Sequence, residues 1–252
     1  MRFHEHIGID YSGAGDPGAG CSGLRVFRSS GGREAVEVRP EPGTRRRWSR
    51  VLLGRWLAEI LRGPEPAIVG IDHCFSFPKA WLDARRLHTW DAFLARFCAG
   101  WPTDREAVAR CRKPGAYARE RTRLRLCERW TSSAKSVFQF GMNGQVAASS
   151  HAGIPWLRRL RQDLGPAVHF WPFDGWSPPP GRHVVAEIYP AILRRRFEGR
   201  RGWTGDQRDA YAVAEWLRTR DAAGLLEPYF APGLTAEERE IASVEGWVLG
   251  IA

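Results

Sequence analysis

Five carboxylate residues stand where they could do chemistry together. Three lie at or near the ends of apolar stretches, and two stand three residues apart in a later amphipathic segment: Asp10, Asp72, Glu187, Asp206 and Asp209. Acids brought to one place repel each other unless a cation neutralises them, and ligation by oxygen alone favours Mg²⁺ or Mn²⁺. Two such ions can stabilise the attacking and leaving oxygens of phosphoryl transfer. These residues are therefore candidate metal ligands.

The first three acids would be carried by short strands. Stretches of alternating or continuous apolar residues, separated by turns rich in Gly, Ser and Pro, predict strands at residues 6–10, 24–28, 34–39, 67–72, 167–172 and 183–189. In an open α/β sheet the strand ends face the crevice where ligands bind. We therefore expect Asp10, Asp72 and Glu187 to meet at one edge of the sheet.

Helices would separate the strands and position the last two acids. Helical periodicity occurs at residues 47–61, 155–164, 206–220 and 235–249. Asp206 and Asp209 share one face of the third helix, close to its apolar stripe. Asp206 also lies inside a Thr-x-x-Gln capping box formed by Thr204 and Gln207, so it could serve only to start the helix.

A basic segment interrupts the alternation of strands and helices. From Lys79 to Lys135 the chain has 14 basic and 6 acidic residues, a net of +8, whereas the rest of the chain contributes +2 to the total of +10. Clustered arginine suits contacts with phosphate, so we expect this segment to bind nucleic acid beside the acidic site. Its periodicity predicts a mainly helical insertion, with helices at residues 90–99, 104–111 and 116–130.

Composition excludes several other classes of protein. Apolar residues make up 43% and charged residues 26% of the chain, as in globular proteins, and no apolar run approaches the roughly 18 residues of a membrane helix. The N-terminus lacks the core of a signal peptide. Five cysteines without a Cys-x-x-Cys pair argue against a disulfide framework or a structural zinc site. We expect a cytoplasmic protein with no membrane partner, and the oligomeric state stays open.

Four motifs follow one another along the chain: HIGIDYSGAG, AIVGIDHCFSFP, VVAEIYPAIL and DQRDAYAVAEWL. Together they resemble a bacterial and archaeal family, the domain of unknown function 429 proteins, which are predicted ribonuclease H-like nucleases. The resemblance covers almost the whole chain and implies one domain over residues 1–252, with residues 79–135 inserted in it. It also implies a mixed five-stranded sheet, three antiparallel strands followed by two parallel strands, with helices on both faces. The family's acids fall on Asp10, Asp72, Glu187, Asp206 and Asp209.

The leading hypothesis is a nuclease that depends on Mg²⁺ or Mn²⁺ and cleaves DNA or RNA by a two-metal mechanism. In this hypothesis Asp10 bridges two ions, Asp72 and Glu187 complete their coordination, and Asp209 closes the catalytic set, with Asp206 as a further metal ligand. Two alternatives stay open. One is an actin-like nucleotide-binding phosphotransferase or ATPase, which needs Gly-rich loops after strands one and four, of which only the first is present. The other is a non-catalytic nucleic-acid-binding protein.

Overall fold

A mixed sheet forms the centre of the molecule. The computed structural model describes residues 1–41, 47–131, 134–141 and 146–251. Over these residues the sheet has seven strands in the order β3-β2-β1-β4-β6-β5, with β7 paired to β6. The strands are β1 (Glu5–Asp10), β2 (Arg25–Ser30), β3 (Val36–Glu37), β4 (Ala67–Asp72), β5 (Val168–Trp171), β6 (His183–Ile188) and β7 (Val248–Leu249).

The direction of the strands changes at β1. The strands β1, β2 and β3 are antiparallel neighbours, whereas β1, β4, β6 and β5 are parallel. The predicted α/β class and the mixed order are confirmed, but the predicted number of five strands is wrong. One edge of β6 is hydrogen-bonded by β5 over His183–Ala186 and by β7 at Glu187 and Ile188. The strand β5, which the apolar pattern at residues 167–172 predicts, and the unpredicted strand β7 thus satisfy backbone groups of β6 that would otherwise be buried without partners.

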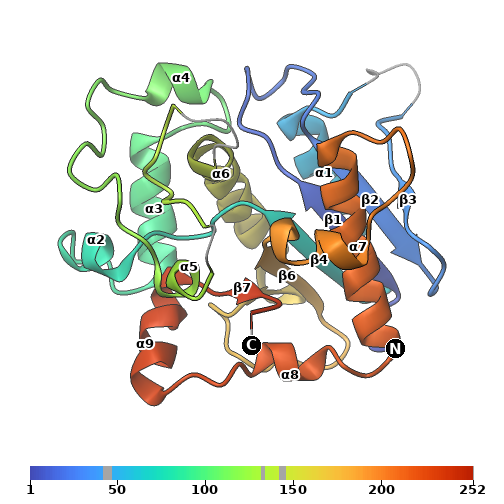
Figure 1. Cartoon of the computed structure of the whole chain (residues 1–252). Helices are drawn as coiled ribbons and strands as arrows, with labels where there is room; N and C mark the ends of the chain where they lie inside the picture. Colours follow the sequence, from blue (N-terminus) through green and yellow to red (C-terminus); the bar gives the residue numbers. More distant parts are fainter. Residues whose placement is uncertain (42–46, 132–133, 142–145, 252) are drawn as a thin grey trace.

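Helices cover both faces of the sheet, as predicted (Figure 1). They are α1 (Arg50–Ile60), α2 (Lys79–Asp83), α3 (Trp90–Gly100), α4 (Val108–Cys111), α5 (Leu126–Arg129), α6 (Val146–Leu164), α7 (Gly205–Ala222), α8 (Glu227–Phe230) and α9 (Ala236–Glu245), with 3₁₀ helices at Gly165–Ala167, Pro190–Ile192 and Arg194–Arg196. No helix in these described ranges is long and apolar enough to cross a membrane.

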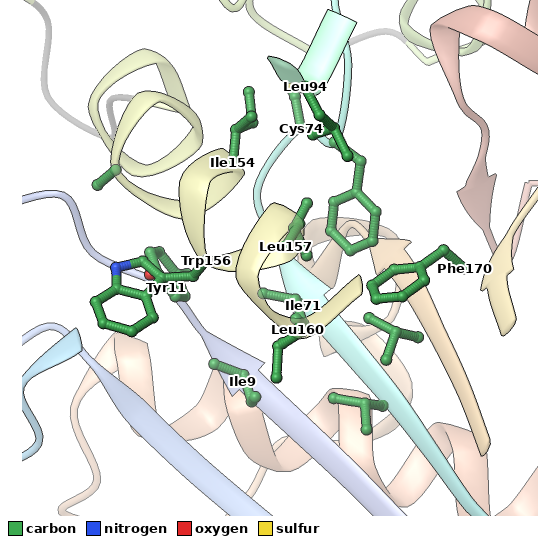
Figure 2. Close-up of a cluster of buried hydrophobic side chains, with 14 of the residues drawn as sticks. Ile9, Tyr11, Ile71, Cys74, Leu94, Ile154, Trp156, Leu157, Leu160 and Phe170 are labelled. Atoms are coloured by element: carbon green, nitrogen blue, oxygen red, sulfur yellow. The ribbon is translucent and has the colours of Figure 1, made fainter. Parts of the chain in front are cut away.

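Alternate residues of the strands enter two separate cores. Ile9 and Ile71 point to the face covered by α1, α3 and α6, where they pack beneath Leu157 and Leu160 (Figure 2). Residues an odd number of positions away along the strand, such as Ile68, which is three positions before Ile71, point to the opposite face and pack with α7. Since side chains alternate along a strand, the two cores hold both faces of the central strands away from water.

Two glycines let α7 approach the centre of the sheet. Gly8 of β1 and Gly70 of β4 are register partners. A Cβ atom on Gly8 would lie 2.1 Å from the carbonyl oxygen of Ala210, and one on Gly70 would lie 2.7 Å from a methyl group of Val213. The helix backbone therefore lies directly on β1.

The basic segment at residues 79–135 is only partly helical. The predicted helix at 90–99 is confirmed as α3, but the one at 104–111 is reduced to α4 and the one at 116–130 to α5. Gly115 and Tyr117 adopt positive φ angles of 70° and 62°, which a helix does not allow. This backbone turns the Tyr117 ring into a parallel arrangement with the rings of Trp101 and Phe140. Packing of aromatic side chains thus replaces the predicted helix.

The last predicted helix is also shorter than expected. It begins with the predicted capping box at Thr235 and Glu238 but ends at Glu245 rather than at residue 249. Gly246 adopts a φ of 79°, which ends the helix, and Val248 then pairs with Glu187 in the sheet. This short strand brings the end of the chain beside the acid of β6.

Candidate functional site

The five predicted acids line one cleft at the carboxyl ends of the parallel strands. Asp10 and Asp72 are the last residues of β1 and β4 and are register partners. Glu187 lies on the next strand, β6, opposite Ile71. Asp206 and Asp209 belong to the first turns of α7. The cleft has a volume of about 700 Å³ and includes all five acids, whose role as metal ligands stays a prediction.

Asp10 and Asp72 sit beside each other without a cationic partner of their own. Burial raises the pKa of Asp10 to about 9, and repulsion from Asp72, Asp206 and Asp209 adds to the rise. Burial likewise raises the pKa of Asp72 to about 8, with repulsion from Asp209 and Glu187. Neither acid is part of an ion pair among the described residues. Both carboxyl groups therefore favour the protonated form near neutral pH in the folded protein.

Asp209 has a cationic neighbour that the sequence did not suggest. The Nε atom of Arg194 lies 2.9 Å from Oδ1 of Asp209. Burial raises the pKa of Asp209, and the Arg194 guanidinium opposes that rise. Asp206 lies one helical turn earlier, inside the predicted capping box of Thr204 and Gln207, which is confirmed. Asp206 thus both occupies the helix start and lines the cleft.

Glu187 differs from the other acids because an arginine of the basic segment holds it. Arg125 is 1% exposed and donates from Nη1 to Oε2 of Glu187 at 2.8 Å, and from Nη2 to Oε1. The amide of Phe75 also donates to Oε2, at 3.0 Å. Burial raises the pKa of Glu187, whereas the charge and hydrogen bonds of Arg125 lower it. Both oxygens of this carboxylate therefore already accept hydrogen bonds from the protein.

Arg125 is the centre of a buried network of three glutamates. Its Nε donates to Glu128 at 2.9 Å, and Nη1 donates to the backbone oxygen of Glu245 at 3.1 Å. The Glu245 carboxylate in turn accepts from the amides of Lys79 and Leu126. The two ends of the basic segment are thus tied to α9 and, through Glu187, to the sheet.

Sequence reasoning missed both arginines of the cleft. Arg125 is one of many arginines in its segment, and nothing in their spacing marks the one that turns inward. Arg194 opens a run of three arginines six residues after the strand that carries Glu187, and this run of like charge close to a predicted acid is the sequence signal for it. Arg194 pairs with Asp209 and Arg125 with Glu187, so each neutralises one predicted ligand.

The Gly-rich turn after β1 forms another wall of the cleft. Ser12 and Gly13 line it. Arg50 is buried and donates to the carbonyl oxygens of Ala14 and Gly15, at 2.8 Å each. A Cβ atom on Gly13 would lie 2.1 Å from the carbonyl oxygen of Ala148 in α6. The turn connects two strands and is held by α1 and α6, as expected for a connection within a hairpin.

The comparisons with known proteins identify no relative. No protein-family model, curated protein or solved structure matches the chain. Inferences about function therefore rest on the residues of the cleft and of the basic segment.

Proposed function

We propose that the protein is a nuclease with a ribonuclease H-like sheet, which uses Mg²⁺ or Mn²⁺ to hydrolyse phosphodiester bonds of nucleic acid. The observation that carries this proposal is the pair Asp10 and Asp72. These acids end neighbouring parallel strands in register, and they share a cleft with Asp209. The order of the first strands, β3-β2-β1-β4, gives the proposal further support.

The chemistry of the donors fits a hard divalent cation. Asp10, Asp72 and Asp209 offer only oxygen atoms, and their repulsion is of the kind that a cation relieves. Within the described ranges, no three His, Cys, Asp or Glu side chains are already arranged to hold an ion. Cation binding therefore requires side chains to adjust. A bound ion would supply an activated water and neutralise charge on the phosphate.

The acids of the cleft would have two different roles, cation binding and positioning. Asp10, Asp72 and Asp209 would hold the cation, with Asp206 at the rim of the set. Glu187 accepts hydrogen bonds from Arg125 and from the amide of Phe75, which directly follows the β4 motif. We therefore assign Glu187 a positioning role that fixes the shape of the cleft.

The basic segment supports nucleic acid as the partner. Many cationic side chains of the segment are exposed and form no ion pair in the described part of the chain, among them Arg112, Lys113, Arg119, Arg121 and Arg123. The end of the segment, including Arg125 and Lys135, lines the acidic cleft. Exposed arginines near a cleft can bind phosphates without reading sequence.

One observation favours a second candidate, a non-catalytic nucleic-acid-binding protein. Arg125 occupies both oxygens of Glu187, which removes one acid from the predicted ligand set. The basic segment would then carry the function alone. The two candidates differ in whether the cleft binds a divalent cation.

The test measures cleavage of single-stranded, double-stranded and hybrid substrates with Mg²⁺, Mn²⁺ or a chelator. We expect cleavage with metal, its loss in Asp10→Asn and Asp72→Asn, and its retention in Asp163→Asn, which neutralises an exposed acid of α6. The nuclease proposal is wrong if the wild type neither cleaves any substrate nor changes its melting temperature with Mn²⁺. Nucleic-acid binding under those conditions would support the second candidate.

A further inference from the structure

Arg194 is held at the acidic cleft by a short, anchored connection. The chain leaves β6 at Ile188 and passes through the 3₁₀ helix Pro190–Ile192 to Leu193, which is buried in the core beneath α7. Arg194 follows directly and lines the cleft, whereas the next residue, Arg195, is exposed and does not line it. The buried leucine fixes the point from which the Arg194 side chain extends.

The contacts of Arg194 leave it able to change partners. Asp209 is the carboxylate that pairs with it in the described residues, and 54% of the Arg194 side chain is exposed. An ion pair with that exposure is weak because water screens it and a long side chain must be held still. Arg125 is different, since it is buried and each nitrogen of its guanidinium donates to an acceptor. Of these two arginines, only Arg194 is available to a ligand.

We propose that Arg194 is a phosphate-binding residue of this cleft and that it takes the place of the divalent cation at Asp209 when no cation is bound. The inference rests on the proposed function. A cation held by Asp209 would compete with this ion pair and leave the guanidinium free to face the cleft. Its planar set of donors can then bind two oxygens of a substrate phosphate. The same residue would thus oppose cation binding and favour substrate binding.

This double role predicts opposite effects of one substitution. Arg194→Ala removes both a competitor for Asp209 and a positive charge, so the protein should bind Mn²⁺ about three- to fivefold more tightly. The same change should weaken binding of a short, labelled single-stranded DNA or RNA, measured with Ca²⁺, by about tenfold. Arg194→Lys keeps the charge but loses the planar fork, so it should restore the Mn²⁺ affinity of the wild type without restoring nucleic-acid affinity.

Arg195→Ala is the matched control, because it removes an equal charge one residue away, outside the cleft. Isothermal titration with Mn²⁺ and fluorescence anisotropy with the oligonucleotides would be run on the wild type and the three variants, after circular dichroism confirms folding. The inference is wrong if Arg194→Ala behaves like Arg195→Ala, or if it weakens Mn²⁺ binding. If the wild type binds no Mn²⁺, the proposed metal site and this inference are both wrong; if it does, only the role of Arg194 is at issue.

Discussion

Arg125 binds both carboxylate oxygens of Glu187 inside the protein, although the two residues are 62 positions apart. The same carboxylate accepts a hydrogen bond from the amide of Phe75. One buried acid of β6 thus fixes the loop after β4 and the inner end of the basic segment. The wall of the acidic cleft depends on this connection.

The first prediction compares two acids of neighbouring strands. Glu187→Gln removes the carboxylate that binds two nitrogens of the buried Arg125 guanidinium, but Glu128 still pairs with it. We therefore expect a loss of stability smaller than the roughly 3–5 kcal/mol that an unpaired buried charge costs. Asp72→Asn removes an acid with no cationic partner of its own, so it should leave stability unchanged or raise it. Urea denaturation of the metal-free proteins measures both changes in the free energy of unfolding.

Mn²⁺ titration of the same variants tests the positioning role of Glu187. We expect folded Glu187→Gln protein to keep cation binding within a few fold, whereas Asp72→Asn should lose it. Equal stability of the two variants together with loss of Mn²⁺ binding in Glu187→Gln would instead make Glu187 a direct ligand.

The second prediction concerns Asp10→Asn without metal and with it. At neutral pH the folded protein must keep Asp10 protonated although the free carboxyl group would ionise, and asparagine removes that cost, so the metal-free variant should melt about 2–4 °C above the wild type. With Mn²⁺ the order should reverse, because the wild type gains stability from the bound cation and the variant does not. Differential scanning fluorimetry with chelator and with Mn²⁺ measures both. A metal-free variant that melts below the wild type would show that the Asp10 carboxylate has a stabilising partner.

The sequence was informative where local pattern decides the structure. Alternating apolar residues and turns located β1, β2, β4 and β6, and the spacing of Asp206 and Asp209 placed both on one face of α7. Acids at strand ends could be expected to converge because parallel neighbours end at one edge of a sheet. Together these local rules were sufficient to predict the cleft.

Other features depend on partners distant in the chain. The helix predicted at residues 116–130 is reduced to α5, and the Tyr117 ring before it packs with Trp101 and Phe140, which belong to other segments of the chain. The burial of the Arg125 side chain likewise depends on its hydrogen bonds to Glu187 and Glu245. Periodicity within a segment carries no information on such contacts, so these features could not be predicted from it.

The third prediction tests how α7 positions its acids. Gly8→Ala would place a Cβ atom 2.1 Å from the carbonyl oxygen of Ala210, so the backbone of α7 must move away from β1. We expect a loss of about 1–3 kcal/mol in unfolding free energy and weaker Mn²⁺ binding, since Asp209 moves with the helix. Gly205→Ala, at the start of α7, is the control, because a Cβ atom there meets nothing within 4 Å. Equal behaviour of the two variants would contradict the close packing of α7.

The last prediction uses the pH dependence of stability. In the folded, metal-free protein the pKa is about 9 for Asp10 and about 8 for Asp72, whereas both are near 3.8 without these surroundings. Between these values the folded state retains protons that the unfolded state has released. Stability therefore falls as pH rises through the folded pKa values, by up to about 1.4 kcal/mol per pH unit for each proton.

Between pH 7 and pH 9 the buried histidines do not titrate, so they do not contribute to the change in stability. Burial lowers the pKa of His73 to about 4 and of His151 to about 3, so both are neutral there. Urea denaturation with chelator should show falling stability for the wild type and a smaller slope for the Asp10→Asn, Asp72→Asn double variant. Buried thiols such as Cys74 contribute equally to the slopes of both proteins, so their contribution cancels when the two slopes are subtracted. With saturating Mg²⁺ the wild-type slope should also diminish, because a cation keeps the carboxylates ionised in the folded state. Equal slopes for wild type and double variant in chelator would mean that Asp10 and Asp72 do not hold protons in the cleft.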